Sequence, residues 1–144
     1  MTEQAASLEI LLAEDNPVDV LITREAMRDW EIATSLHVVQ DGKEALDFLY
    51  KHGNYAGKSR PDLVMLDLNL PKASGKEVLA AIKQDPDLQN IVVVIVTTSR
   101  VHAHLQACRD LGANLCITKP LELDAYIQAV NSVKDFWLSG RATV

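Results

Sequence analysis

Cysteine is scarce in this sequence: Cys108 and Cys116 are the two thiols among 144 residues. Two thiols are too few for the disulfide framework that stabilises small secreted domains. The N-terminal segment MTEQAASLEI also lacks the basic start and the apolar stretch of a secretory signal peptide. These features predict a protein of the reducing cytoplasm.

Positive charge is also in short supply, and no long hydrophobic run is present. The chain has 14 Lys and Arg against 20 Asp and Glu, which gives a net charge of −6. A nucleic-acid-binding protein would carry a basic face, so we expect no nucleic-acid partner. No segment approaches the roughly 20 apolar residues of a membrane span, so we expect no membrane insertion. The 48% hydrophobic and 24% charged residues are typical of a globular protein.

Several catalytic signatures are missing as well. The sequence has no glycine-rich phosphate-binding loop with its lysine, and no pattern that indicates a Ser-His or Cys-His pair. We therefore expect neither a nucleotide hydrolase of the P-loop type nor a triad hydrolase, and we predict that the chain is not an enzyme.

Short apolar runs alternate with amphipathic segments along the whole chain. The predicted strands are 8–13, 34–40, 62–68, 91–97 and 113–119. The predicted helices are 16–30, 41–53, 74–85, 100–112 and 122–138. Five strands alternating with five helices predict a doubly wound α/β fold, because right-handed crossovers place helices on both faces of a parallel sheet. We expect one domain over residues 1–144, with a core from 8 to about 138 and no output domain.

Local signals mark where the helices begin and which faces they bury. Asn16 and Ser74 are suited to cap two of the helices. In the last helix, Leu123, Ile127 and Val130 form an apolar stripe that we expect to face the sheet.

Polar residues follow four of the five strands, where each strand ends. Glu14 and Asp15 follow the first, Asp67 falls at the end of the third, Thr97 ends the fourth and Lys119 ends the fifth. Each has an ordinary explanation by itself, such as a helix-entry acid or a solvated lysine. Together they point to a ligand site, because ligands bind beyond the carboxyl ends of the strands in open α/β sheets.

A divalent cation would relieve the repulsion among the three carboxylates. Mg²⁺ prefers oxygen ligands, uses one or two carboxylates and keeps several waters, so phosphoryl oxygens could reach it. Asp67 interrupts a buried apolar stretch, where a charge is costly unless it is compensated. The residues therefore favour a carboxylate nucleophile beside a metal ion.

Four motifs carry a specific resemblance to a known family. At their spacings, LLAEDNPVD, PDLVMLDLNLP, VVVIVTTS and CITKP resemble the receiver domain of two-component response regulators over residues 8 to about 138. The resemblance implies a flavodoxin-like sheet with strand order 2-1-3-4-5. It also implies Mg²⁺-dependent transfer of a phosphoryl group from a histidine kinase in a phosphorelay.

The same resemblance assigns roles to individual residues. Asp67 would be the phosphoacceptor, and Asp15, Asp67 and the backbone carbonyl of Asn69 would ligate Mg²⁺ directly. Glu14, which stands where the family more often has aspartate, would act through a metal-bound water. Thr97 would be the switching hydroxyl and Lys119 would pair with the acyl phosphate.

A narrower resemblance concerns the partner. AEDNPVD, the lengthened loop KHGNYAGKSRPDL, DLNLPKASGKEVL and the terminal DFWL are similar to single-domain regulators of phytochrome-type histidine kinases. Related regulators serve other sensors, and that alternative stays open.

Two further expectations concern the switch and the output surface. Cys116 stands where many receivers carry an aromatic that follows the threonine inward, and Ser99 occupies a variable position near the site. We expect a homodimer through the face formed by residues 100–111, the fifth strand and the last helix. Phe136 and Trp137 could belong to this surface or could close the core.

Three other interpretations fit the sequence less well. Loss of Asp67, Thr97 or Lys119 would have favoured a phosphorylation-independent binding module, and all three residues are present. A phosphatase that acts through an aspartyl phosphate would need a second acid two residues after the nucleophile, where Asn69 stands. His104 and Cys108, four residues apart on one helix, could seat a metal, but structural zinc needs four ligands.

Overall fold

The computed structural model describes residues 7–139 and contains a parallel sheet with helices on both faces. The strands are β1 Leu8–Ala13, β2 Thr34–Val39, β3 Leu63–Leu66, β4 Val92–Thr97 and β5 Leu115–Thr118. Every neighbouring pair is parallel, and the strand order is β2-β1-β3-β4-β5. The predicted fold class and strand order are confirmed.

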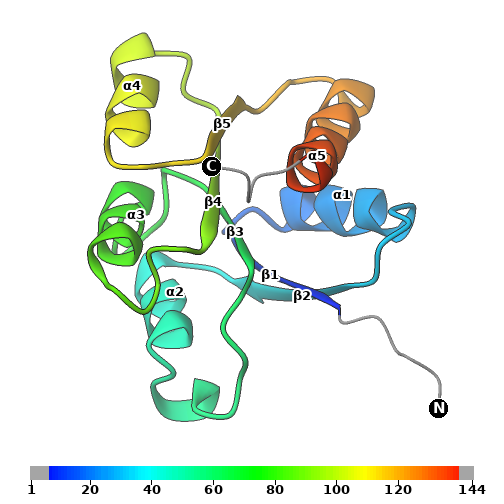
Figure 1. Cartoon of the computed structure of the whole chain (residues 1–144). Helices are drawn as coiled ribbons and strands as arrows, with labels where there is room; N and C mark the ends of the chain where they lie inside the picture. Colours follow the sequence, from blue (N-terminus) through cyan, green and yellow to red (C-terminus); the bar gives the residue numbers. More distant parts are fainter. Residues whose placement is uncertain (1–6, 140–144) are drawn as a thin grey trace, which may run out of the picture.

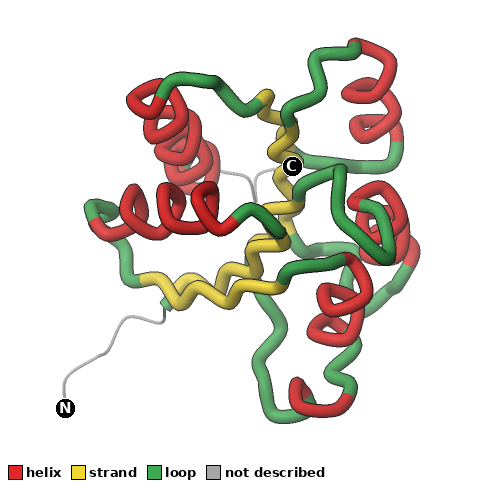
Figure 2. The backbone as a smooth tube through the Cα atoms, turned by 180° about the vertical axis from the view of Figure 1, so that it is seen from behind, coloured by secondary structure: helices red, strands yellow, loops and turns green. Residues whose placement is uncertain are grey.

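Two helices cover one face of the sheet and three cover the other. The helices are α1 Pro17–Arg28, α2 Gly42–Leu49, α3 Gly75–Gln84, α4 His102–Asp110 and α5 Leu123–Leu138. Helices α1 and α5 lie together on one side, and α2, α3 and α4 lie on the opposite side (Figures 1 and 2). Helix α2 ends at Leu49 and not near Gly53 as predicted, and a short 3-10 helix, η1 Gly53–Tyr55, follows it at the start of the segment expected to be a loop.

Local sequence predicted the starts of α1 and α3 correctly, but it predicted the buried face of α5 less well. The Asn16 side chain accepts hydrogen bonds from the backbone of Val18 and Asp19, and Ser74 accepts one from Glu77, so both predicted caps are confirmed. In α5, however, Leu123 is exposed, so the predicted stripe was wrong at its first position.

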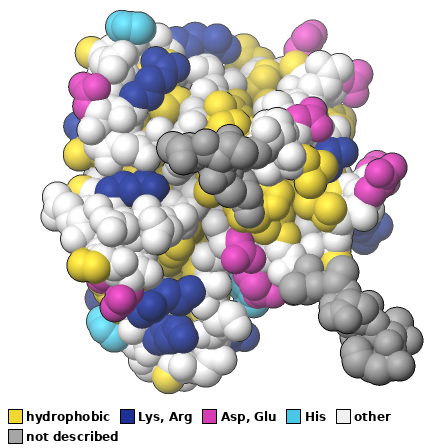
Figure 3. All heavy atoms as spheres, viewed as in Figure 1, with side chains coloured by type: hydrophobic (Ala, Val, Ile, Leu, Met, Phe, Trp, Pro, Cys, Tyr) yellow, Lys and Arg dark blue, Asp and Glu magenta, His cyan; other side chains and the backbone are white. Residues whose placement is uncertain are grey.

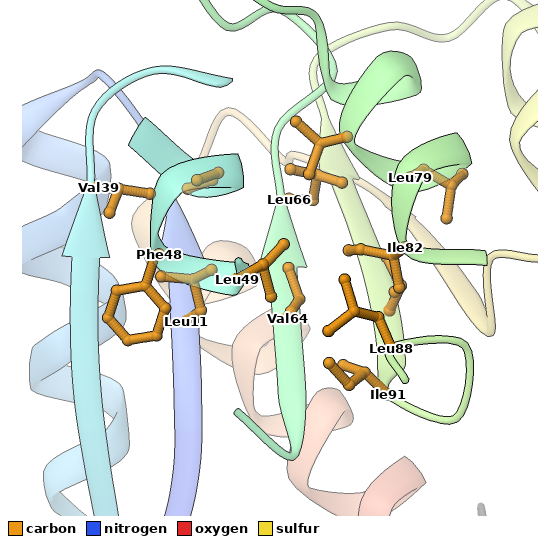
Figure 4. Packing of buried hydrophobic residues seen from close by; sticks show 14 of the residues in the cluster. Leu11, Val39, Phe48, Leu49, Val64, Leu66, Leu79, Ile82, Leu88 and Ile91 are labelled. Atoms are coloured by element: carbon orange, nitrogen blue, oxygen red, sulfur yellow. The ribbon is translucent and has the colours of Figure 1, made fainter. Parts of the chain in front are cut away.

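Two apolar layers hold the helices against the sheet. In the first, Leu11 and Val64 of the sheet pack with Phe48 of α2 and with Leu79 and Ile82 of α3 (Figure 4). In the second layer, side chains of β1, β3 and β4 pack against α1 and α5. Because both faces are covered, the central strands are almost wholly apolar, as in most parallel sheets.

The surface agrees with a chain of mixed charge. Acidic and basic side chains both occur on the face shown in Figure 3, with hydrophobic side chains between them. Within residues 7–139, every helix is too short or too polar to cross a membrane. Phe136 and Trp137 are half-buried and pack against the apolar layer of α1 and α5.

Candidate functional site

The backbone holds three of the predicted site residues just beyond the ends of their strands. Asp67 N–H donates to the Ala13 carbonyl at 3.2 Å, and Glu14 N–H donates to the Val39 carbonyl at 3.0 Å. Lys119 N–H likewise donates to the carbonyl of the residue that ends β4. Sheet hydrogen bonding therefore continues one residue past each strand and fixes where these side chains begin.

The Lys119 ammonium lies at the centre of the site. Its Nζ lies 2.6 Å from Glu14 Oε1, 2.9 Å from Asp19 Oδ2 and 3.1 Å from Asp67 Oδ2. Lys119, Glu14 and Asp67 are all buried. A buried lysine is tolerated when its charge is paired and hydrogen-bonded, and here three carboxylates supply that compensation.

Asp19 is the site residue that sequence reasoning missed. It lies in the first turn of α1, where acidic residues are common because they interact favourably with the helix N-terminus. Its position gave one usable signal: the turn that follows β1 begins at the edge of the sheet where the other acids lie. The structure directs its carboxylate to Lys119.

The acidic residues form a cluster that can hold a cation. Carboxylate oxygens of Glu14, Asp15 and Asp67 all lie within 4.8 Å of one another, and Asp15 is the exposed member. Asp67 Oδ1 accepts the N–H of Asn69 at 2.9 Å, so one carboxylate oxygen is held by its own loop and the other by Lys119. An all-oxygen donor set open to solvent through Asp15 fits a hard divalent ion such as Mg²⁺.

The electrostatics of the site favour a further positive charge. Burial raises the pKa of the Glu14 carboxyl from 4.5 to about 7, although the Lys119 ammonium acts in the opposite direction. Burial alone would lower the pKa of Lys119, but its bonds to Glu14 and Asp19 and the charge of Asp67 hold that pKa above its ordinary value. Lys119 therefore stays charged, while Glu14 is only partly compensated without a metal ion.

A glycine lets the next helix approach the site. A Cβ at Gly75 would lie 2.3 Å from the backbone oxygen of Asp67 and 2.7 Å from the Cα of Leu68. Gly75 N–H donates to the Leu68 carbonyl at 3.0 Å. The missing side chain thus allows α3 to pack against the backbone that carries Asp67.

Thr97 is fully buried at the end of β4, and its Oγ1 accepts the N–H of Ser99 at 3.1 Å. Cys116 on the neighbouring strand is half-buried and packs against the apolar layer that contains Cys108. Thr97 and Lys119 are neighbours through the backbone of these two strands. The two residues are therefore adjacent at the end of the sheet, and the Thr97 hydroxyl is bonded to the loop that leads to α4.

The alternative metal pair is not supported. Cys108 is buried in the core, whereas His104 is exposed and contacts Ser99. Among residues 7–139, the one group of three or more His, Cys, Asp and Glu ligands close enough for a metal is Glu14, Asp15 and Asp67.

Comparison with known families decides what kind of protein carries this site. The model of the response regulator receiver domain matches residues 10–131. The chain belongs to the response regulator receiver family. Members of this family are signalling proteins rather than enzymes, in agreement with the expectation from the sequence.

Relatives of this receiver domain are regulators of similar size. It is 41% identical over 129 residues to response regulator Rcp1 of Synechocystis sp., covering 90% of this chain and 88% of Rcp1. It is 36% identical to the probable methanogenesis regulatory protein FilR2 of Methanothrix harundinacea, covering 90% and 83% of the two chains.

Solved structures extend the likeness to the fold of the receiver domain. The phosphorylated cyanobacterial phytochrome response regulator RcpA is 43% identical and aligns with a TM-score of 0.89 over 93% of this chain and 96% of its own. The Mn²⁺-bound form of Rcp1 is 40% identical and aligns with a TM-score of 0.87 over 92% and 95%. This receiver domain therefore resembles regulators of phytochrome signalling in both sequence and fold.

Proposed function

We propose that this receiver domain accepts a phosphoryl group on Asp67 from the phosphohistidine of a sensor kinase. The observation that carries the proposal is the contact of the buried Lys119 ammonium with Asp67 Oδ2, beside a cluster of acidic oxygens. The phosphorylated state of the relative RcpA supports it.

Asp67, Asn69 and Lys119 have different roles in the transfer. An Asp67 oxygen attacks phosphorus while the bond from phosphorus to the imidazole nitrogen breaks, and the released nitrogen keeps the electron pair and takes up a proton from solvent. The backbone bonds of Asp67 and Asn69 orient the carboxylate, and Lys119 balances charge on the phosphoryl oxygens. Such transfers depend mainly on positioning and on charge stabilisation, so no further acid or base is required.

We propose that Mg²⁺ is the metal, held by Asp15, Asp67 and the backbone carbonyl of Asn69, with Glu14 acting through a bound water. When bound, the ion would neutralise charge between the carboxylates and the phosphoryl oxygens. The close approach of the Glu14, Asp15 and Asp67 oxygens supports this assignment, as does the Mn²⁺-bound structure of the relative Rcp1.

The partner we propose is a phytochrome-type histidine kinase in the cytoplasm. The likeness to RcpA and Rcp1 supports this choice. The half-buried Cys116 and the buried Cys108 are both free thiols, which suits a reducing compartment.

The substitution Asp67→Asn tests the acceptor. Labelling by a phosphohistidine donor or by acetyl phosphate in the presence of Mg²⁺ should fall by at least about a hundredfold, because an amide is a poor nucleophile. Asp62→Asn is the matched control, since Asp62 lies directly before β3 and Asp67 directly after it. Labelling that persists in Asp67→Asn, or that is lost equally in Asp62→Asn, would place the acceptor elsewhere.

We further propose that the signal leaves through a homodimer formed by α4, β5 and α5. Val101, Leu121 and Leu123 are large, exposed hydrophobic side chains on or beside this face. Leu121 is 94% exposed, so Leu121→Glu should weaken the dimer without disturbing the core. Sedimentation velocity of both proteins, with and without phosphorylation, measures this; a wild type that stays monomeric in both states would contradict the dimer.

A further inference from the structure

Ser99 connects the Thr97 hydroxyl to two neighbouring elements. Its backbone N–H donates to Thr97 Oγ1 at 3.1 Å, and its side-chain Oγ lies 2.9 Å from His104 Nδ1 in the first turn of α4. Its carbonyl accepts the Thr118 hydroxyl of β5 at 3.5 Å. One residue of the loop between β4 and α4 therefore contacts the end of β4, the end of β5 and α4.

Helix α4 is packed less fully than α3, and its start is bonded to this loop. Cys108 is the one fully buried residue of α4, whereas α3 buries four. The N-cap position of α4 is Val101, whose side chain makes no capping bond, and its backbone N–H donates instead to Ser99 Oγ at 3.3 Å. Ser99 thus accepts the N–H of the N-cap residue, one of the first N–H groups that have no partner within the helix.

The hydrogen bonds around the Ser99 hydroxyl fit one consistent assignment. The oxygen accepts the Val101 N–H, and the single hydroxyl hydrogen is then available to donate to His104 Nδ1. In this assignment the neutral imidazole carries its hydrogen on Nε2. The Ser99 side chain is therefore held from both sides, by the start of α4 and by its first turn.

A change at Thr97 would be transmitted through these bonds. A change between staggered χ1 rotamers rotates the threonine hydroxyl by about 120° around the bond between Cα and Cβ. The Ser99 N–H would then either follow the hydroxyl or lose its acceptor. If the Ser99 N–H follows the hydroxyl, the Ser99 side chain moves with its backbone and the contact to His104 changes. If the bond breaks, Ser99 loses one of the bonds that hold it in place.

We propose that Ser99 and His104 form a link that carries the state of the Thr97 hydroxyl to α4. His104 acts as a positioning residue, since it holds the Ser99 side chain and does not touch the acidic cluster. The proposal rests on the proposed phosphorylation of Asp67 and on the role of switching hydroxyl that the family resemblance implies for Thr97, whose hydroxyl would turn toward the phosphoryl group. The link gives α4 a route of response that does not need an aromatic side chain at Cys116.

The experiment uses the full chain with beryllofluoride and Mg²⁺ as the phosphoryl probe. Backbone amide NMR shifts are followed at the site, around Asp67, and along α4. Ser99→Ala and His104→Ala remove the link, whereas His104→Asn keeps a polar atom close to the position of Nδ1. Gln106→Ala is the matched control, because Gln106 bonds Asp110 on the exposed side of the same helix.

The site amides should shift in every variant, but the α4 shifts should be at least about twofold smaller in Ser99→Ala and His104→Ala than in the wild type. His104→Asn should restore them, and Gln106→Ala should match the wild type. The double variant Ser99→Ala with His104→Ala should lose no more than either single one, as expected for residues acting through one contact.

Two results would overturn the link: α4 shifts of wild-type size in both alanine variants, or a His104→Asn protein that behaves like His104→Ala. Failure of the wild-type site amides to respond to beryllofluoride would instead refute the proposed function itself.

Discussion

The centre of the sheet and the edge formed by β5 and α4 are built differently. Every residue of β3 and β4 is buried, whereas every residue of β5 is only partly buried. The helices follow the same pattern, because α3 buries four residues and α4 buries Cys108 alone. Local opening is easier where few apolar contacts hold an element, so the edge is the more adaptable region.

The difference in burial fits separate roles for the centre and the edge of the sheet. Glu14 and Asp67 lie at the ends of the central strands β1 and β3, where backbone bonds and full burial keep the carboxylates in place. Lys119 belongs to the edge strand but bonds to both carboxylates, so it joins the regions. Chemistry on a rigid centre and response in a loosely packed edge would follow from this arrangement.

The largest effect on stability is expected when one isoleucine is replaced by alanine in each of the two regions. Ile95 of β4 is fully buried and Ile117 of β5 is half-buried. Ile95→Ala should lower the free energy of unfolding by about 4 kcal/mol, because it leaves a cavity in the core, and Ile117→Ala by about 1–2 kcal/mol. Urea denaturation followed by circular dichroism measures both, and equal losses would break the contrast between centre and edge.

A second prediction concerns the close approach of α3 to the site. Gly75→Ala should cost about 2–3 kcal/mol of stability and should also weaken Mg²⁺ binding, since the backbone of Asp67 must move to admit the new Cβ. Gly57→Ala is the control, because no atom lies within 4 Å of its added Cβ. If the two variants unfolded at the same urea concentration, the packing of α3 on the site would not be tight.

The raised pKa of Glu14 predicts how stability changes with pH in metal-free protein. Between pH 4.5 and about 7 the folded state holds a proton on Glu14 that the unfolded state has lost. The free energy of unfolding should therefore fall as pH rises through this window, by about 3 kcal/mol. Glu14→Gln should remove this part of the slope, whereas Glu25→Gln on the exposed side of α1 should leave it unchanged. Persistence of the full slope in Glu14→Gln would assign it to another group.

The smallest expected effect is the difference in Mg²⁺ binding between variants of the exposed Asp15 and of the buried Glu14. Asp15→Ala should weaken Mg²⁺ binding more than tenfold, which corresponds to about 1.4 kcal/mol, because it removes a proposed direct ligand. Glu14→Gln should weaken binding less, since its proposed contact runs through a water. A fluorescence or calorimetric Mg²⁺ titration that ranked the two variants in the opposite order would reverse their assigned roles.

Much of this protein follows from its sequence alone. Apolar, β-branched runs such as 91–97 are typical of buried strands, and their alternation with amphipathic segments predicts a parallel sheet covered on both faces. Parallel strands then bring their carboxyl ends to one edge, so residues directly after β1, β3 and β5 had to lie near one another. Glu14, Asp67 and Lys119 were predictable for that reason, and so were the caps at Asn16 and Ser74, which depend on a few neighbouring residues.

The tertiary structure decided the contacts that depend on how a helix is rotated and placed over the sheet. Periodicity predicted that Leu123 would be buried, yet α5 exposes it and buries Tyr126. The bond of Asp19 to Lys119 and the contact of Ser99 with His104 arise in the same way, because each joins a helix to a strand end or loop. A helical pattern fixes which residues share a face, but packing against the whole sheet fixes which direction that face points.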